Sequence, residues 1–230
     1  MRRQLAWDGC YNVRDLGGLR TRNGRTRWGA VIRGDHPSGL TAAGWQALRQ
    51  HGVRTIIDLT GAGPPPEAAG LDHVALPLDD HSDTEFWSRW TNALSCTPLY
   101  YRAFLDRFPG TVAAVVTAIA EAEPGGVLVH CSGGRDRSGL ITVVLLAAVG
   151  IDAADIAADH ALSHDRRAEQ CAAVGLPDDT PKVHQLVAEH GTSEQEVIAD
   201  VVASRDFAAY LRFAGVSAEL LAALRDRMVT

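Results

Sequence analysis

A cysteine, two glycines and two arginines stand close together near the middle of the chain. Residues 130–139 read His-Cys-Ser-Gly-Gly-Arg-Asp-Arg-Ser-Gly, with one apolar run before them and another after them. A thiol attacks as its thiolate, and both a helix N-terminus and a nearby arginine favour that anion. The segment supplies both features if a strand precedes it and a helix follows it, so Cys131 is a candidate nucleophile.

The residues after Cys131 suit the binding of a phosphate group. Gly133 and Gly134 allow a tight turn, in which successive backbone N–H groups can converge on one anion-binding concavity. Arg137 ends the loop, and its planar guanidinium can hold two phosphate oxygens and stabilise their charge in a transition state. Arg135 adds a second positive charge that can contact another phosphate or an acidic substrate. The candidate binding residues are Ser132, Gly133, Gly134, Arg135 and Ser138.

The alternative interpretation is a buried structural cysteine that precedes an ordinary glycine-rich turn. A lone cysteine or a lone Gly-Gly pair fits that interpretation. The whole combination does not, because an apolar strand, a nucleophile, two glycines, an arginine and an apolar helix occur in the order that phosphate chemistry requires. We therefore expect a phosphate site at residues 131–138.

The elements that must position this loop alternate between strands and helices. Strands are predicted at residues 30–33, 54–59, 73–78 and 127–130, and helices at 42–51, 112–119 and 138–149. Such alternation predicts an α/β domain with a largely parallel central sheet flanked by helices. Ligands bind at the carboxyl ends of strands in these sheets, and the cysteine loop occupies that position.

The last third of the chain is predicted to be helical. Asp152, Ser193 and Ser217 stand where helix caps are expected, and Glu196 completes a capping-box spacing with Ser193. We expect residues 1–230 to form a single domain, with residues 164–205 as a helical lid over the site.

Composition narrows the classes of function. A hydrophobic fraction of 46% is typical of a globular protein, and a net charge of −6 argues against a nucleic-acid partner. The four cysteines include no C-x-x-C pair, which favours a reducing, cytoplasmic setting. The N-terminus has no recognisable signal peptide, although export by another route stays compatible with the sequence. The longest apolar run, residues 139–151, is too short for a transmembrane segment.

The loop resembles the Cys-x5-Arg-Ser/Thr signature of the protein-tyrosine phosphatase superfamily. It is most similar to the bacterial tyrosine/serine phosphatase branch, whose opening motif resembles residues 12–18 (Asn-Val-Arg-Asp-Leu-Gly-Gly). Residues 55–59 (Thr-Ile-Ile-Asp-Leu) resemble a strand of the same branch. The resemblance implies the cysteine-phosphatase fold, a phosphocysteine at Cys131, and no metal or other cofactor. It also implies that Ser138 hydrogen-bonds the thiolate and that His130 orients the cysteine.

Two places in the chain can supply the general acid. Many family members carry it in a Trp-Pro-Asp tripeptide, which this chain lacks. The resemblance offers Asp136, because an aspartate before the loop arginine marks this branch. Asp79, Asp80 and Asp83 are the alternatives, because they follow a predicted strand where dual-specificity relatives place their acid. We favour Asp136.

The implied activity is hydrolysis of phosphotyrosine and, with dual specificity, of phosphoserine or phosphothreonine in proteins. A phosphoinositide substrate is the first alternative, since myotubularin-type lipid phosphatases also end the loop with Asp-Arg. A phosphate-binding module without turnover is a weaker alternative, because the chain has both a nucleophile and a phosphate-binding arginine. A rhodanese-like sulfurtransferase is also weaker, because the loop ends in Arg137-Ser138.

Several polar residues are given structural roles by the sequence. Arg14 and Asp15 are expected to form a buried pair that supports the loop, and Asp58 to accept hydrogen bonds at the end of the sheet. The remaining histidines show no ligand spacing along the chain and are expected to be surface or packing residues.

Overall fold

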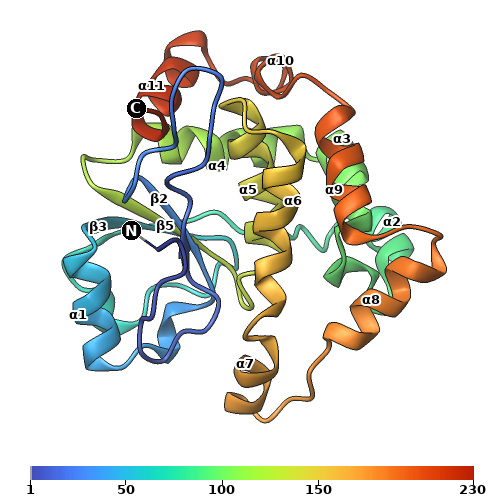
Figure 1. The fold of residues 1–230 in the computed structure, drawn as a ribbon, viewed down its shortest axis with the longest axis horizontal. Helices are drawn as coiled ribbons and strands as arrows, with labels where there is room; N and C mark the ends of the chain where they lie inside the picture. The colour runs from blue at the N-terminus through green and yellow to red at the C-terminus, as the bar shows by residue number, and fades with distance from the viewer. Residues whose placement is uncertain (1) are drawn as a thin grey trace.

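The computed structural model describes residues 2–230, and among them five strands form one sheet (Figure 1). Their order across the sheet is β1-β2-β5-β3-β4; β1 is antiparallel to β2, and the other neighbours are parallel. The strands are β1 (Arg14–Asp15), β2 (Val31–Gly34), β3 (Val53–Asp58), β4 (Asp72–Ala75) and β5 (Gly126–His130). The prediction of an α/β fold with a largely parallel sheet is confirmed.

Helices occupy most of the rest of the chain. The α-helices are α1 (Ala42–Gln50), α2 (Thr84–Trp87), α3 (Tyr101–Arg107), α4 (Pro109–Glu121), α5 (Asp136–Ala148), α6 (Ala153–Ala161), α7 (Arg167–Ala173), α8 (Thr180–Glu189), α9 (Glu194–Ala203), α10 (Phe207–Phe213) and α11 (Ala218–Met228). Short 3₁₀ turns are η1 (Pro37–Gly39), η2 (Pro66–Ala68), η3 (Ser88–Trp90), η4 (Leu94–Cys96), η5 (Pro98–Tyr100) and η6 (Leu162–His164).

Alternation of side chains along the strands gives the sheet two buried faces. In β5, Leu128 packs with α1, whereas Val127 and Val129 pack with α4 and α5. Successive side chains on a strand point to opposite faces, so a continuous apolar run fits a sheet that is covered on both sides. Figure 1 shows α1 on one side of the sheet and α4, α5 and α6 on the other.

Local signals place the starts of α1, α9 and α11 correctly, whereas α4 and α5 begin at Pro109 and Asp136, before the predicted residues 112 and 138. The Thr41 side chain accepts a hydrogen bond from the N–H of Gly44 and caps α1. Ser193 and Glu196 form the expected capping box at the start of α9, and Ser217 caps α11. These bonds satisfy N–H groups that have no partner within their own helix.

The sequence prediction differs from the structure at the edges of the sheet. Strand β4 ends at Ala75 rather than at residue 78, although the N–H groups of Leu76 and Leu78 still donate to the carbonyls of Asp58 and Leu59 at 2.8 and 3.2 Å. The two-residue strand β1 was not predicted, since so short a segment carries no periodic signal. Helices α2 and α3, with four and seven residues, were missed for the same reason.

The segment predicted as a lid divides into two parts. Helix α9 packs beside α6, and its Ile198 and Val201 belong to the main core. Helices α7 and α8 lie further out, as the orange part of the ribbon shows (Figure 1).

Within residues 2–230, no single helix combines the length and apolar character needed to cross a bilayer. One sharply bent pair, Pro98–Arg107 followed by Pro109–Glu121, meets those two criteria together.

Candidate active site

The cysteine loop joins the end of β5 to the start of α5, at the carboxyl edge of the sheet. Strand β5 lies between β2 and β3, so the loop stands over the middle of the sheet. The Cys131 side chain is buried, and its Sγ lies 3.5 Å from the Oγ of Ser138 in the first turn of α5. The hydroxyl of Ser138 is therefore in position to donate a hydrogen bond to a thiolate.

Buried side chains hold four successive carbonyl groups of the loop. Asn12 donates to the carbonyl of Gly133 at 3.0 Å, and Tyr101 donates to that of Asp136 at 2.7 Å. One guanidinium nitrogen of Arg33 donates to the carbonyls of both residues between them, Gly134 and Arg135, at 2.9 and 3.0 Å.

This arrangement of carbonyl groups decides where the N–H groups point. In a trans peptide the carbonyl of one residue and the N–H of the next point in opposite directions, and the described chain has no cis bond. The N–H groups of residues 134–137 are therefore directed away from these donors and toward the other side of the loop. Several N–H groups on one concave side form a site for an anion.

Gly134 is required by the loop backbone. Its φ is +67°, a region that residues with a Cβ rarely adopt. A Cβ at this position would lie 2.6 Å from the backbone nitrogen of Asp35. The turn and the close approach of β2 both demand glycine here.

Arg137 lies at the mouth of the loop. One of its terminal nitrogens donates to the Oγ of Ser132 at 2.9 Å, and the other lies 3.1 Å from a carboxylate oxygen of Asp79. The guanidinium fork is thus held at the loop by a residue of the loop and by a residue that follows β4. A fork in this position can bind two oxygens of a phosphate.

Arg135 lies in a different environment from the one that the sequence suggested. Its side chain is 2% exposed, and each guanidinium nitrogen already has a carboxylate partner. Nε contacts Asp136 at 3.1 Å, and the two terminal nitrogens contact Asp179 at 3.0 and 3.1 Å. Burial by itself lowers the pKa of Arg135, but the two carboxylates outweigh it and raise that pKa. Arg135 therefore ties the loop to the segment before α8.

The structure separates the three acidic alternatives after β4. Asp83 caps α2 by accepting from the N–H of Phe86, and it pairs with Arg107 at 2.7 Å. Asp80 accepts from the N–H of Ser82 in a surface turn. Asp79 is the member of this group that reaches the loop, through Arg137.

Burial raises the pKa of the Asp79 carboxyl, and Asp136 adds to this rise, whereas Arg137 and His81 act against it. A raised pKa favours the protonated form that a general acid needs. Asp79 is therefore a second candidate for the acid besides Asp136, whose carboxylate accepts from Nε of Arg135.

Comparisons with known proteins decide the family. A model of the tyrosine phosphatase family matches residues 5–230. This chain belongs to the tyrosine phosphatase family. The predicted family is thereby confirmed, and the chain is a cysteine-dependent phosphatase.

Relatives of the phosphatase occur in several bacteria. It is 32% identical over 180 residues to a provisionally named tyrosine-protein phosphatase of Cupriavidus necator, a match that covers 73% of this chain and 66% of the relative. It is 28% identical over 253 residues to the triple specificity protein phosphatase PtpB of Mycobacterium tuberculosis, covering 95% and 86%. A tyrosine-protein phosphatase of Nostoc commune is 27% identical over 170 residues, covering 66% and 58%.

A buried carboxylate in α6 holds the arginines behind the loop of this phosphatase. Asp159 is fully buried and contacts Arg14 and Arg33, each at 3.0 Å, as well as Arg3. Burial by itself raises the pKa of Asp159, but these arginines outweigh it and lower the pKa well below its usual range. Asp159 thus fixes Arg33, which in turn holds two loop carbonyls.

The expectation that Arg14 pairs with Asp15 is wrong. Adjacent residues of a strand point to opposite faces, so the two side chains lie in separate networks. Arg14 turns to Asp159, whereas Asp15 accepts from the N–H groups of Gly17 and Gly29 and contacts His51. Asp159 itself was missed, because nothing near it in the sequence marks it as the partner of arginines more than 120 residues away.

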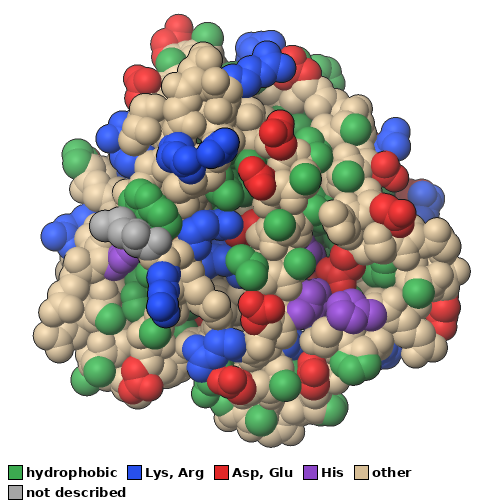
Figure 2. All heavy atoms as spheres, viewed as in Figure 1, with side chains coloured by type: hydrophobic (Ala, Val, Ile, Leu, Met, Phe, Trp, Pro, Cys, Tyr) green, Lys and Arg blue, Asp and Glu red, His purple; other side chains and the backbone are tan. Residues whose placement is uncertain are grey.

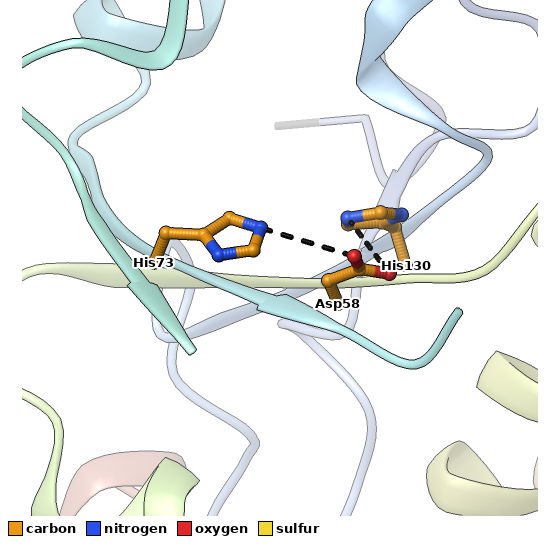
Figure 3. Close-up of side chains that lie close together, drawn as sticks. All are labelled: Asp58, His73 and His130. Carbon is orange, nitrogen blue, oxygen red and sulfur yellow. Dashed lines mark ion pairs between the residues drawn. The ribbon is translucent and has the colours of Figure 1, made fainter. Parts of the chain in front are cut away.

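Asp58 lies between two histidines at the end of β3 (Figure 3). Its oxygens are 3.8 Å from Nε2 of His130 and 3.9 Å from Nε2 of His73. Burial lowers the pKa of His130 to about 4, so its ring is neutral near pH 7. Asp58 also accepts hydrogen bonds from Thr60 and from the N–H of Gly63, which confirms its expected role at the sheet end.

Proposed function

We propose that this phosphatase hydrolyses phosphotyrosine in proteins, and phosphoserine or phosphothreonine as well, through a phosphocysteine at Cys131. The observation that supports this most is the loop itself. Its carbonyl groups are bound from behind by buried side chains, its N–H groups face the opposite side, and Cys131 and Arg137 stand at its two ends. Cys131, Arg137 and Asp136 are the proposed catalytic residues.

The proposed reaction has two displacements at phosphorus. The Cys131 thiolate forms a bond to phosphorus as the bond to the substrate oxygen breaks, and Asp136 gives its proton to that oxygen. A water molecule then attacks the phosphocysteine, releasing inorganic phosphate and the thiolate, and its proton returns to the carboxylate. The Ser138 hydroxyl, 3.5 Å from Sγ, would stabilise the departing thiolate.

The loop backbone and Arg137 would bind the phosphate throughout. Ser132, Gly133 and Gly134 belong to this binding site, and Arg137 would exchange its contact with Asp79 for phosphate oxygens. For Arg135 we propose a positioning role, since its guanidinium nitrogens are engaged by Asp136 and Asp179. Because Cys131 must be a free thiol, the proposal includes a reducing, cytoplasmic setting.

A phosphoinositide is the second candidate substrate. A groove of about 310 Å³ beside the loop is lined by Ser132, Gly133 and Arg167, and by the apolar Val174 and Leu176. These two apolar side chains are 67% and 60% exposed. Apolar groups next to a phosphate site could contact a lipid surface while the headgroup enters the loop.

The segment 164–205 remains a proposed lid. Its helix α7 brings Gln170 to the carbonyl of Gly133, and Asp179, before α8, pairs with both Arg135 and Arg167. These contacts support a role for the segment in covering the loop.

A substrate panel tests the function. Phosphate release is measured for a phosphotyrosyl peptide, a phosphoseryl peptide and phosphoinositides in vesicles, and thiocyanate formation from thiosulfate and cyanide is measured in parallel. We expect phosphate release, fastest with the phosphotyrosyl peptide, and no thiocyanate. Faster release from the vesicles would establish the lipid as substrate, and thiocyanate formation would establish a sulfurtransferase.

The general acid is tested by the leaving group of the substrate. Asp136→Asn should lower the rate on a phosphotyrosyl peptide by roughly 10²–10⁴-fold, because the leaving oxygen of this substrate needs a proton. Asp79→Asn should lose less activity. The loss in Asp136→Asn should shrink with p-nitrophenyl phosphate, whose leaving group departs without a proton. The measurement is the ratio of the two rate constants in each variant.

Asp80→Asn is the matched control, since Asp80 lies in a surface turn and should leave both rates nearly unchanged. If Asp136 only shapes the loop, its replacement should lower the rate constants for both substrates by the same factor. If Asp79→Asn alone shows the dependence on leaving group, Asp79 is the acid and the assignment of Asp136 is wrong.

A further inference from the structure

Three histidines gather around one glutamate on the face formed by α6, α8 and α9. Glu194, the first residue of α9, has carboxylate oxygens 3.1 Å from Nε2 of His164, 3.3 Å from Nδ1 of His160 and 3.5 Å from Nε2 of His184. Figure 2 shows histidine side chains beside acidic ones on this face. The sequence suggested surface or packing roles for these histidines, and the structure brings three of them from three separate elements to one carboxylate.

The distances fit the ligand sphere of a metal ion. His164, His184 and Glu194 each offer a ligand atom, and these atoms all lie within 4.8 Å of one another. In a tetrahedral zinc site with ligand bonds of about 2.0–2.1 Å, neighbouring ligand atoms are roughly 3.3–3.4 Å apart. Nε2 of His164 lies 3.1 Å from Oε2 of Glu194 and Nε2 of His184 lies 3.5 Å from Oε1, so each histidine nitrogen is near that separation from one oxygen of the carboxylate.

Two buried polar atoms at the cluster make no hydrogen bond to any of the described residues 2–230. Oε1 of Glu194 is buried and accepts no hydrogen bond, and Nδ1 of His160 is buried without one. A buried oxygen with an unused lone pair is costly unless something binds it. A cavity of about 300 Å³ opens beside these groups, lined by His164, His184 and Glu194 and by the apolar Val187 and Ala188.

We propose that His164, His184 and Glu194 bind a divalent metal ion of the zinc type. Two imidazoles and a carboxylate are ligands that zinc prefers, and the cavity leaves room for water at a fourth position. His160 is a positioning residue. Its Nδ1 lies 3.3 Å from the carboxylate, and its Nε2 lies 3.1 Å from the hydroxyl of Tyr101.

The metal would join three parts of the chain rather than take part in the chemistry at Cys131. His164 ends η6, His184 lies in α8, and Glu194 begins α9. Helix α8 directly follows Asp179, which holds Arg135 of the phosphate loop. The hydroxyl of Tyr101 connects His160 to the carbonyl of Asp136. The proposed metal site is independent of the proposed phosphatase activity.

Metal binding is tested in the Cys131→Ser background, so that the reactive thiolate cannot bind the ion. The protein is stripped with a chelator and freed of it, and zinc chloride is titrated in by calorimetry. We expect one equivalent to bind through this cluster and the melting temperature to rise with zinc concentration, because the ion binds the folded state. Cobalt(II) in the same site should give the visible spectrum of four-coordinate nitrogen and oxygen ligands.

His184→Gln is the decisive variant, because that side chain is 58% exposed and its replacement should leave the fold intact. We expect zinc affinity to fall at least tenfold, and the cobalt spectrum and the zinc-dependent rise in melting temperature to be lost. His190→Gln is the matched control: His190 follows the same helix, is exposed, and lies outside the cluster, so it should keep full affinity. His160→Gln should weaken binding about 10–100-fold, as loss of a group that orients a ligand does.

Equal zinc affinity in the His184→Gln and His190→Gln proteins would overturn the proposal. An unchanged melting temperature of the parent protein in saturating zinc would overturn it as well. Neither result would bear on phosphate release, which is measured separately in the protein with Cys131 intact.

Discussion

Replacing Cys131 by serine is expected to abolish turnover, with a loss on the order of the 10⁶-fold seen when other hydrolases lose their nucleophile. A serine hydroxyl is far less ionised than a thiol, so the first displacement at phosphorus does not occur. The loop N–H groups and Arg137 remain, and binding of inorganic phosphate should persist. The measurements are the rate on p-nitrophenyl phosphate and on a phosphotyrosyl peptide, together with calorimetric titration of phosphate.

A second cysteine provides the control for this variant. Cys96 in η4 is half-buried and has no assigned part in the reaction, so Cys96→Ser should keep a near-normal rate. Substantial turnover in Cys131→Ser would show that another group attacks phosphorus. Loss of phosphate binding along with turnover would show that the loop needs the thiol for its shape.

Arg137→Lys is expected to lower kcat by about 10³–10⁵-fold, the range seen when an arginine that stabilises a transferring phosphoryl group is removed. An ammonium group carries the charge but cannot bind two oxygens in one plane. The effect should fall on kcat more than on KM, because charge on the equatorial oxygens is bound most strongly in the transition state. Steady-state kinetics on a phosphotyrosyl peptide measure both constants.

Arg89→Lys is the matched control for Arg137→Lys. Arg89 is 70% exposed and pairs only with Glu85 among the described residues, so its replacement should change neither constant. A near-normal kcat in Arg137→Lys would show that another cation binds the phosphate oxygens. Arg135 in the loop and Arg167 in α7 would then be the residues to test. Unchanged melting temperatures in both variants would show that the change in kcat does not come from a loss of folding stability.

The features that lie within one short stretch of chain could be predicted from the sequence. The apolar run of β5, the turn at Gly134 and the start of α5 follow one another without a gap, so spacing along the chain determined their spacing in space. Helix caps such as Thr41 and Ser193 were predictable for the same reason, since each bonds an N–H three residues away. The position of Cys131 relative to Ser138 is local in this sense as well.

What surrounds the loop was decided by the tertiary structure. Asn12, Arg33 and Tyr101 hold its carbonyl groups from three separate parts of the chain, and Asp159 holds Arg33 from a fourth. Which buried donor meets which acceptor depends on how the helices pack on the sheet, and no local pattern encodes it.

The acid and the histidine cluster show the same limit. Asp79, Asp80 and Asp83 look alike in the sequence, but the fold turns only Asp79 to Arg137 among them. His164, His184 and Glu194 are separated by 20 and 10 positions along the chain, and they meet because α9 packs beside α6 and His184 of α8 reaches the same carboxylate. The sequence by itself determined the reacting loop and its chemistry, because those residues are neighbours in the chain; the tertiary structure decided its supports and the histidine cluster, because those contacts arise only when distant helices pack together.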